Sequence, residues 1–294
     1  MNQMTVEKPA AHTALAALLK NYSAEVTTHD RASLDAAGAL LPRGTEVFIA
    51  ALMKDDPDRH VAAAMKVRQG GLEPVPHIVA RNLRSKADLD SLLARLAGEA
   101  GVERALVLGG DRDKAAGEFE SSLQLIETGL FQKHGIKRIA IGCYPEGHPR
   151  IPGAALDEAR AAKLRAAEQA GLDVLLVSQF CFDAQPILSL TRHMRALGCN
   201  APFRVGVAGP ADRATLVKYA VICGVGASLR ALKERQNLAK NMLSGETPEG
   251  VLSKVAAAQN DEPSLGISSV HFFTFGALAN TIKWVENCTR DARE

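Results

Sequence analysis

The sequence predicts an α/β protein built as a single (β/α)8 TIM barrel, with an N-terminal helix and extra helices before the eighth strand. Eight short apolar segments alternate with amphipathic helical patterns along the chain, which is the element order of such a barrel. Polar residues that are unusual for their surroundings fall where a strand passes into the following helix. In barrels of this class that end of the strands carries the active site.

Each predicted strand is short, rich in apolar or β-branched residues, and bounded by Gly, Pro or charge. The strands are expected at residues 22–28, 46–52, 73–81, 104–111, 138–144, 174–183, 203–208 and 267–275. The helical patterns between them carry one apolar stripe, as in Lys86–Ala100, where leucines recur at intervals of three and four residues. A single stripe suits a helix that packs on a sheet.

The two ends of this repeat are expected to carry additions. Residues 1–21 are predicted to form a tail and one capping helix, and residues 22–294 the barrel catalytic domain. The crossover before the eighth strand is long enough for two helices, Leu229–Ser244 and Pro248–Gln259. The 294 residues exceed the usual domain size of roughly 100–150, but single barrels of about 250 residues are common. We therefore expect one domain.

Charge and cysteine content argue against several classes of protein. The 35 basic and 33 acidic residues nearly cancel, and no basic run with interleaved aromatics indicates a nucleic-acid partner. No apolar run approaches the roughly 20 residues that span a bilayer, and the N-terminus lacks a signal-peptide core. The five cysteines show neither disulfide nor zinc spacing. We expect a cytoplasmic protein without membrane, nucleic-acid or metal partners.

Glu25 and His77 are ionisable residues within the apolar runs of predicted strands. If Glu25 faces the barrel mouth, desolvation would raise the pKa of its carboxyl and let it act as an acid near neutral pH. The alternative is a surface Glu on the outward face of the first strand. His77 lies in the apolar body of the third strand, where an isolated His is more often a hydrogen-bonded core residue than a ligand or catalyst.

The later strand ends carry further candidates. At the end of the fourth strand, Gly109 and Gly110 would let a ligand approach the backbone, and Asp111 follows directly. The alternative there is a tight turn with Asp111 as helix cap. Gln179 ends the sixth strand with an amide that can read a donor–acceptor pair on a heterocycle, or that is satisfied by neighbouring backbone.

The loop after the fifth strand holds an aromatic residue, an acid and an imidazole between two prolines, in Tyr144-Pro145-Glu146-Gly147-His148-Pro149. Ordering such a loop costs entropy, which indicates that something is held there. The aromatic residues of the eighth strand, His271-Phe272-Phe273-Thr274-Phe275, are better explained by packing than by stacking on a cofactor.

Six of these segments lie in order: Ser23–Glu25, Pro76-His77, Leu108–Asp111, Tyr144–Pro149, Ser178–Asp183 and His271–Thr274. Together they resemble the methylenetetrahydrofolate reductase family over nearly the whole chain. The end of the seventh strand, Gly206–Pro210, and the segment Cys223–Gly226 are similar to a short, divergent bacterial branch.

The resemblance implies an oxidoreductase of one-carbon metabolism that interconverts 5,10-methylenetetrahydrofolate and 5-methyltetrahydrofolate by hydride transfer. It implies bound FAD, NADH as co-substrate and a homo-oligomer. Glu25 would be the general acid that protonates the folate amine, and Asp111 would hydrogen-bond the pterin and support the positive charge that develops there. Gln179 would bind the pterin amide edge. The direction could serve methionine biosynthesis or the oxidation of methyl groups released by demethylation.

The same resemblance assigns the flavin side to six residues, His77, Gly109, Gly110, Tyr144, His148 and Lys163. The protein would orient the flavin, which does the redox chemistry. The chain departs from the family where Val26–His29 replaces an aromatic-proline run, where Gly109 replaces an Arg, and where Ala166 and Ala167 replace a polar and a basic group. Lys163 and Arg165 could still reach a phosphate.

Three other functions stay open. One is a flavin-independent methylenetetrahydrofolate reductase, and a second is a folate-binding or regulatory barrel without catalysis. The third is a metal-dependent barrel hydrolase or lyase that uses His77, Asp111, His148 and His271, although no His-x-His pair or ligand-spaced acid cluster supports it.

Overall fold

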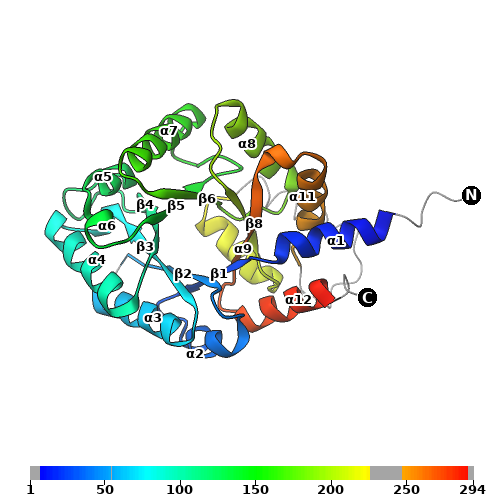
Figure 1. Cartoon of the computed structure of the whole chain (residues 1–294), viewed down its shortest axis with the longest axis horizontal. Coiled ribbons are helices and arrows are strands. Elements are labelled where there is room, and N and C mark those ends of the chain that lie inside the picture. Colours follow the sequence, from blue (N-terminus) through cyan, green and yellow to red (C-terminus); the bar gives the residue numbers. More distant parts are fainter. Residues whose placement is uncertain (1–6, 54, 226–246, 291–294) are drawn as a thin grey trace, which may run out of the picture. The chain divides into compact units, whose positions relative to one another are not determined.

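The computed structural model describes residues 7–53, 55–225 and 247–290. Eight strands pair in chain order and close into a barrel, which confirms the predicted fold (Figure 1). The strands are β1 Ser23–Thr27, β2 Glu46–Ala50, β3 Glu73–Val79, β4 Arg104–Leu108, β5 Arg138–Cys143, β6 Asp173–Ser178, β7 Phe203–Ala208 and β8 Ile267–Phe273. Within the described residues no helix has the length and apolar character that crossing a membrane requires.

Helices follow every strand, and an additional helix precedes the first one. The longer helices are α1 Glu7–Leu19, α2 Arg31–Leu40, α3 Pro57–Gln69, α4 Lys86–Ala100, α7 Gly153–Gln169, α8 Ala184–Ala196, α9 Arg213–Ile222, α11 Glu249–Asp261 and α12 Leu278–Arg290. The short ones are α5 Ser122–Glu127, α6 Leu130–Lys133 and the 3-10 turns η1 Ala80–Asn82 and η3 Pro263–Leu265.

Most strands end earlier than the sequence predicts. Only β7 has both of its predicted bounds, and β4 stops at Leu108 rather than Asp111. The chain turns away there because Gly110 adopts φ +102°. After β3, residues 80–82 coil into η1 instead of continuing the strand. The residues that carry the candidate chemistry therefore lie just beyond the strands rather than in them.

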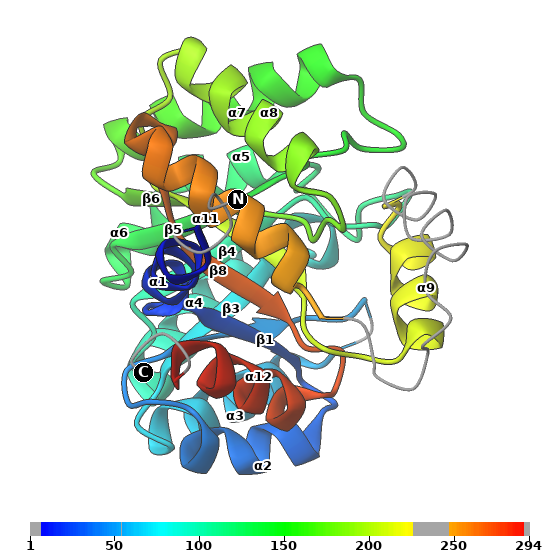
Figure 2. The ribbon, with the colours of Figure 1, turned by 90° about the vertical axis from the view of Figure 1, so that its right-hand side faces the viewer.

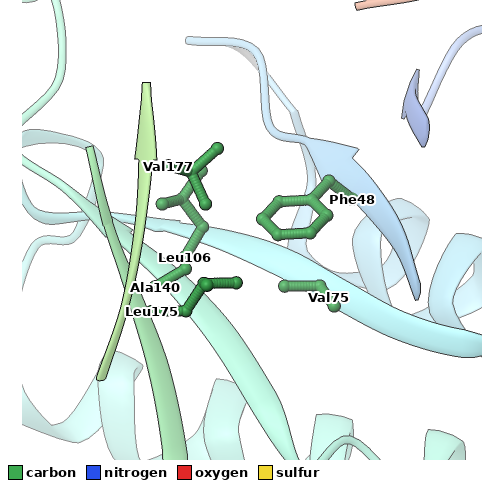
Figure 3. Packing of buried hydrophobic residues seen from close by; sticks show 6 residues of the cluster. All are labelled: Phe48, Val75, Leu106, Ala140, Leu175 and Val177. Carbon is green, nitrogen blue, oxygen red and sulfur yellow. The ribbon is translucent and has the colours of Figure 1, made fainter. Parts of the chain in front are cut away.

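One compact unit comprises residues 23–142 and 151–177. Its core is formed by side chains from five strands that point toward one another, Phe48, Val75, Leu106, Ala140, Leu175 and Val177 (Figure 3). Helix α4 packs its predicted leucine stripe inward, because all four leucines are buried. Ser85 caps the start of α4 by accepting a hydrogen bond from the Asp88 N–H, and Gly101 ends it in the left-handed conformation.

The other unit comprises residues 1–22, 143–150 and 178–294. The N-terminal helix α1 packs against α11, α12 and β8, as Figure 2 shows, so the predicted N-terminal helix is confirmed. The extra helix predicted at Pro248–Gln259 corresponds to α11. The other extra helix, predicted at Leu229–Ser244, lies outside the described residues, and the single-domain division stays a prediction.

Candidate functional site

Strand register places Glu25 on the interior face of the sheet. Glu25 is the register partner of Phe48, and Phe48 is the partner of Val75. Partners in neighbouring strands share a face, and Phe48 and Val75 both belong to the interior core cluster. The Glu25 side chain is 17% exposed. This position argues against the alternative of an outward-facing surface Glu.

His77 lies on the same face and contacts Glu25. Its Nε2 is 3.3 Å from Glu25 Oε2, and the imidazole is buried. This distance is that of an ion pair, but the contact lacks the geometry of an ordinary hydrogen bond, since Nε2 makes none to any described residue. The ring is also held edge-on by Phe48, with 6.4 Å between ring centroids. Two predicted site residues are thus brought together.

Behind His77 lies a second buried imidazole, His60 of α3, which the sequence reasoning missed. Burial, followed by the nearby His77, lowers the pKa of His60 to about 4. The His60 ring hydrogen-bonds to the Ile49 backbone, which opposes that shift. His60 is therefore neutral at physiological pH. The identity of the residue does not distinguish a buried His from a surface one. Its position on the apolar side of α3 is the one signal that could have indicated burial.

The loop after β4 combines an open backbone position with a strained one. A side chain at Gly109 would meet no atom within 4 Å, whereas a Cβ at Gly110 would lie 2.5 Å from Val79 Cγ1. Asp111 follows and is exposed. It is not a helix cap, because the next helix, α5, starts only at Ser122 with Ser121 as its N-cap. The alternative of Asp111 as a helix cap is therefore wrong.

Two arginines order this loop. The Arg81 guanidinium donates to the backbone carbonyls of Arg112 and Glu120. Arg112 in turn donates to Asn82 Oδ1 and to the Met53 carbonyl. These hydrogen bonds join the loop after β4 to η1 and to the loop after β2, and so they hold the segment that contains Asp111.

A third cluster, also missed from the sequence, centres on Asp55 in the loop after β2. Asp55 accepts hydrogen bonds from Thr28 Oγ1, from the Leu52 N–H and from His29 Nε2. The other ring nitrogen of His29 lies 3.1 Å from Arg59. Thr28 and His29 belong to the segment Val26–His29, which departs from the family pattern. In this protein both residues hydrogen-bond to Asp55.

In the other unit, Tyr144 and His148 contact each other across the loop after β5. Their rings meet edge-on with centroids 5.1 Å apart, and His148 Nδ1 accepts from the Arg150 N–H. The Cys181 thiol donates to Glu146 of the same loop. Two predicted flavin-side residues are thus adjacent.

Gln179 is held at the end of β6 by its backbone. Its N–H donates to the Cys143 carbonyl, and its side-chain oxygen accepts from the Phe180 N–H. The backbone alternative for Gln179 is thus correct for the oxygen, while the Nε2 group makes no hydrogen bond to any residue that the structure describes. A small pocket borders Gln179, and it is lined by Tyr144–Gly147, Gln179, Phe180 and Cys223–Val225.

The remaining predicted cofactor residue, Lys163, lies on α7 and is half-buried. Ala167 on the same helix is fully buried, so this position packs on protein and does not face a ligand. In the part of the chain that the structure describes, no group of three or more His, Cys, Asp or Glu residues could hold a metal ion. The hydrolase alternative therefore gains no support.

Comparison with a family model described as methylenetetrahydrofolate reductase gives a match over residues 33–287. The match includes every predicted site residue except Glu25, which precedes it.

Three solved structures share the fold at low identity. An uncharacterized protein from Clostridium thermocellum that binds two copies of 5-methyl-5,6,7,8-tetrahydrofolic acid has 11% identity and a TM-score of 0.59, covering 96% of this chain and 98% of its own. A 2,3-dimethylmalate lyase has 10% identity and a TM-score of 0.50, covering 100% and 88%. A putative phosphonomutase from Burkholderia cenocepacia has 11% identity and a TM-score of 0.50, covering 97% and 100%.

Proposed function

Because the chain belongs to the methylenetetrahydrofolate reductase family, we propose that it interconverts 5,10-methylenetetrahydrofolate and 5-methyltetrahydrofolate by hydride transfer, with FAD as cofactor and NADH as co-substrate. The observation that carries the proposal is the position of Glu25. It is an acid on the interior face of a barrel strand, largely withdrawn from water and in contact with an imidazole. A dry carboxyl of this kind suits general acid catalysis.

Glu25 supplies a proton in the proposed reaction. Opening the five-membered ring of the folate requires protonation of an amine nitrogen, and the resulting iminium carbon accepts the hydride. Reversal returns the proton to the carboxylate. Desolvation, nearby charges and hydrogen bonds together set the protonation state of a carboxyl at such a site.

Asp111 and Gln179 bind the folate ring in this proposal. The exposed Asp111 carboxylate follows the open backbone at Gly109, where it can accept hydrogen bonds from an aminopyrimidine and stabilise its developing positive charge. Gln179 Nε2 can donate to a ring carbonyl, because the amide oxygen is already used by the Phe180 N–H.

The flavin side rests on open backbone and on an aromatic pair. Gly109 leaves room for a ring to approach, and any side chain at Gly110 would meet Val79. Tyr144 and His148 would contact the ring system, His77 would lie beside it, and Lys163 would reach a phosphate. These residues fit a flavin. When bound, it would carry hydride between nicotinamide and folate.

A second candidate function is folate binding without turnover. It is favoured by Ala167, which stands where the resemblance expects a polar or basic residue for the dinucleotide. Ala167 is fully buried and offers no group that could bind a phosphate. The Clostridium thermocellum neighbour, which binds 5-methyltetrahydrofolic acid, makes a pure binder chemically plausible for this fold. A flavin-independent reductase would share the folate side of the site.

The visible absorption spectrum of the purified protein tests the proposal. We expect an oxidised-flavin spectrum that is bleached under anaerobic conditions by NADH and, separately, by 5-methyltetrahydrofolate. Bleaching by NADH alone would leave a flavoprotein with another substrate. A colourless protein that neither takes up FAD nor oxidises NADH with methylenetetrahydrofolate would contradict the proposal. We further propose a cytoplasmic homo-oligomer, which sedimentation of the purified protein tests.

A further inference from the structure

We infer that Arg81 is the positioning residue of Asp111: its backbone and its guanidinium hold the loop after β4, residues 109–121, and so keep the Asp111 carboxylate where the folate ring would meet it. Arg81 lies in η1, directly after β3, and is not among the residues assigned above to folate or flavin. This inference rests on the proposed function for the identity of the ligand. The holding of the loop is a property of the ligand-free protein.

Arg81 bonds to the backbone on both sides of Asp111. Its N–H donates to the Gly109 carbonyl at 3.0 Å, and its guanidinium Nη1 donates to the Arg112 carbonyl at 2.9 Å. Between these two points, Gly110 has φ +102°. A glycine there gives the chain before Asp111 many accessible conformations, and the two hydrogen bonds restrict them.

The same residue also holds the far part of the loop. The Arg81 carbonyl accepts from the Ala116 N–H at 2.9 Å, and Nε donates to the Glu120 carbonyl at 3.0 Å. Nε also lies 3.4 Å from the Glu120 carboxylate, but that side chain is 63% exposed, so water screens the ion pair. The two side-chain hydrogen bonds to carbonyls therefore join points of the loop that are distant in sequence.

The part of the loop beyond Asp111 has anchors of its own. The backbone of Gly117 lies against Arg84, because a Cβ at Gly117 would lie 1.8 Å from the Arg84 carbonyl oxygen. The Glu118 carboxylate accepts from the Lys86 N–H at the start of α4. Neither contact involves the guanidinium. Removing the guanidinium should therefore loosen the segment that carries Asp111 more than the segment that follows it.

The guanidinium acts through the loop rather than on a ligand. Two of its nitrogens, Nε and Nη1, are directed at backbone carbonyls of the loop, and 29% of the Arg81 side chain is exposed. Misplacement of a functional group by about 1 Å can lower a rate by about a hundredfold. The effect of Arg81 on the ligand should therefore depend on the carboxylate of Asp111.

A double-mutant cycle tests this dependence, with 5-methyltetrahydrofolate as the probe. Arg81→Met keeps an apolar stem and removes every side-chain donor. We expect it to raise the dissociation constant, measured by calorimetry, by about tenfold or more in wild type and by less than about twofold in Asp111→Asn. A residue that acts through Asp111 has nothing left to position in the second background. Equal weakening in both backgrounds overturns the inference, because a general structural effect is additive.

Arg84→Met is the matched control. Arg84 is an exposed arginine that meets the loop through its backbone, so this variant should leave the dissociation constant unchanged. If Arg81→Met does not fold, Arg81→Lys replaces it. An amine keeps the charge but lacks the planar fork that spans two carbonyls. Arg81→Lys should then weaken binding by about threefold or more only when Asp111 is present, and an additive result overturns the inference.

Amide exchange in the ligand-free protein separates this inference from the proposed function. The Ala116 N–H should exchange about tenfold faster or more in Arg81→Met, whereas the amides of α4 should not change. If exchange responds but wild type binds no 5-methyltetrahydrofolate, the holding of the loop by Arg81 stands and the proposed function fails. If folate binds while neither exchange nor the double-mutant cycle responds to Arg81, the proposed function stands and the inference fails.

Discussion

The Thr28 hydroxyl donates a hydrogen bond of 2.6 Å to Asp55 Oδ2 and so joins the end of β1 to the loop after β2. The same carboxylate accepts from the Leu52 N–H and from His29. Glu25 lies on β1, three residues before Thr28. The hydrogen bonds of Asp55 therefore help to fix the position of Glu25, the candidate acid.

Asp55→Asn should destabilise the protein at neutral pH. Burial by itself would raise the pKa of Asp55, but the hydrogen bonds from Thr28, Leu52 and His29 outweigh it and lower the pKa. A lowered carboxyl pKa contributes stability above the unfolded value of about 4, and that stability is lost as pH falls through the folded value. We expect a loss of about 1–3 kcal/mol at pH 7.

Urea unfolding of wild type and Asp55→Asn from pH 7 to pH 3 measures this difference. The gap between the two proteins should narrow below about pH 4, as the wild-type carboxylate becomes protonated. Asp35→Asn, at an exposed carboxylate on α2, is the control and should change stability by less than about 0.5 kcal/mol. A gap that stays constant down to pH 3 would show that the charge of Asp55 is not what stabilises the loop.

His60 should make the protein lose stability in mild acid. Because burial, aided by His77, lowers the pKa of His60 from 6.5 to about 4, the unfolded chain takes up a proton first as pH falls. The stability that His60 contributes is present above pH 6.5 and disappears toward pH 4. The loss is at most roughly 3.5 kcal/mol, from about 1.4 kcal/mol for each pH unit. Thermal unfolding of wild type and His60→Gln across this range measures it, and parallel curves would contradict the prediction.

Tyr22 should make the protein lose stability in alkali. Burial, and then the nearby negative charge of Glu286, raise the pKa of Tyr22 to about 12. The unfolded chain ionises first as pH rises through about 10, so the stability from a neutral Tyr22 is present below pH 10 and is lost between about pH 10 and 12. Absorbance at 295 nm during an alkaline titration should show one tyrosine that ionises well above pH 10, at the same pH at which the protein unfolds. Tyr22→Phe should remove that step, and a Tyr22 signal that ionises near pH 10 in the folded protein would refute it.

Gly109 and Gly110 form a matched pair. Gly110→Ala should destabilise by about 1–3 kcal/mol, because the backbone has φ +102° and the new Cβ would lie 2.5 Å from Val79 Cγ1. Gly109→Ala meets no atom within 4 Å and should change stability by less than about 1 kcal/mol. If the open space at Gly109 is where a ring approaches, Gly109→Ala should instead weaken flavin or folate affinity. Equal unfolding free energies for the two variants would contradict the prediction.

Glu25→Gln should reduce folate-dependent turnover by about 10²–10⁴-fold, because general acid catalysis contributes effects of this size. The dissociation constant for 5-methyltetrahydrofolate, measured by calorimetry, should change little. Glu103→Gln, at an exposed carboxylate before β4, is the control and should retain full turnover. Unchanged turnover in Glu25→Gln would remove this carboxyl from the mechanism, and lost binding without a turnover effect would make it a binding residue.

The sequence by itself determined the barrel and most of the candidate residues. Strand and helix order follow from local hydrophobic period, which a single chain displays directly, and Lys86–Ala100 is a helix with the predicted bounds. The glycines at 109 and 110 were recognised as a place where a ligand could approach the backbone, but residues 109–111 were predicted as the end of a strand. The sequence pattern did not predict where the strands end. For example, β4 ends at Leu108 and not at Asp111, because the end of a strand depends on its neighbours in the sheet and not on its own composition.

Only the tertiary structure decided the environment of the ionisable groups. The face on which Glu25 lies depends on its register with Phe48, and a shift of one residue would have turned the side chain outward. The contacts Glu25–His77 and Thr28–Asp55 join residues far apart in the chain. His60 is neutral because folding buries it beside a second imidazole. Proton affinity depends on solvation and on nearby charge, and both arise from packing in three dimensions.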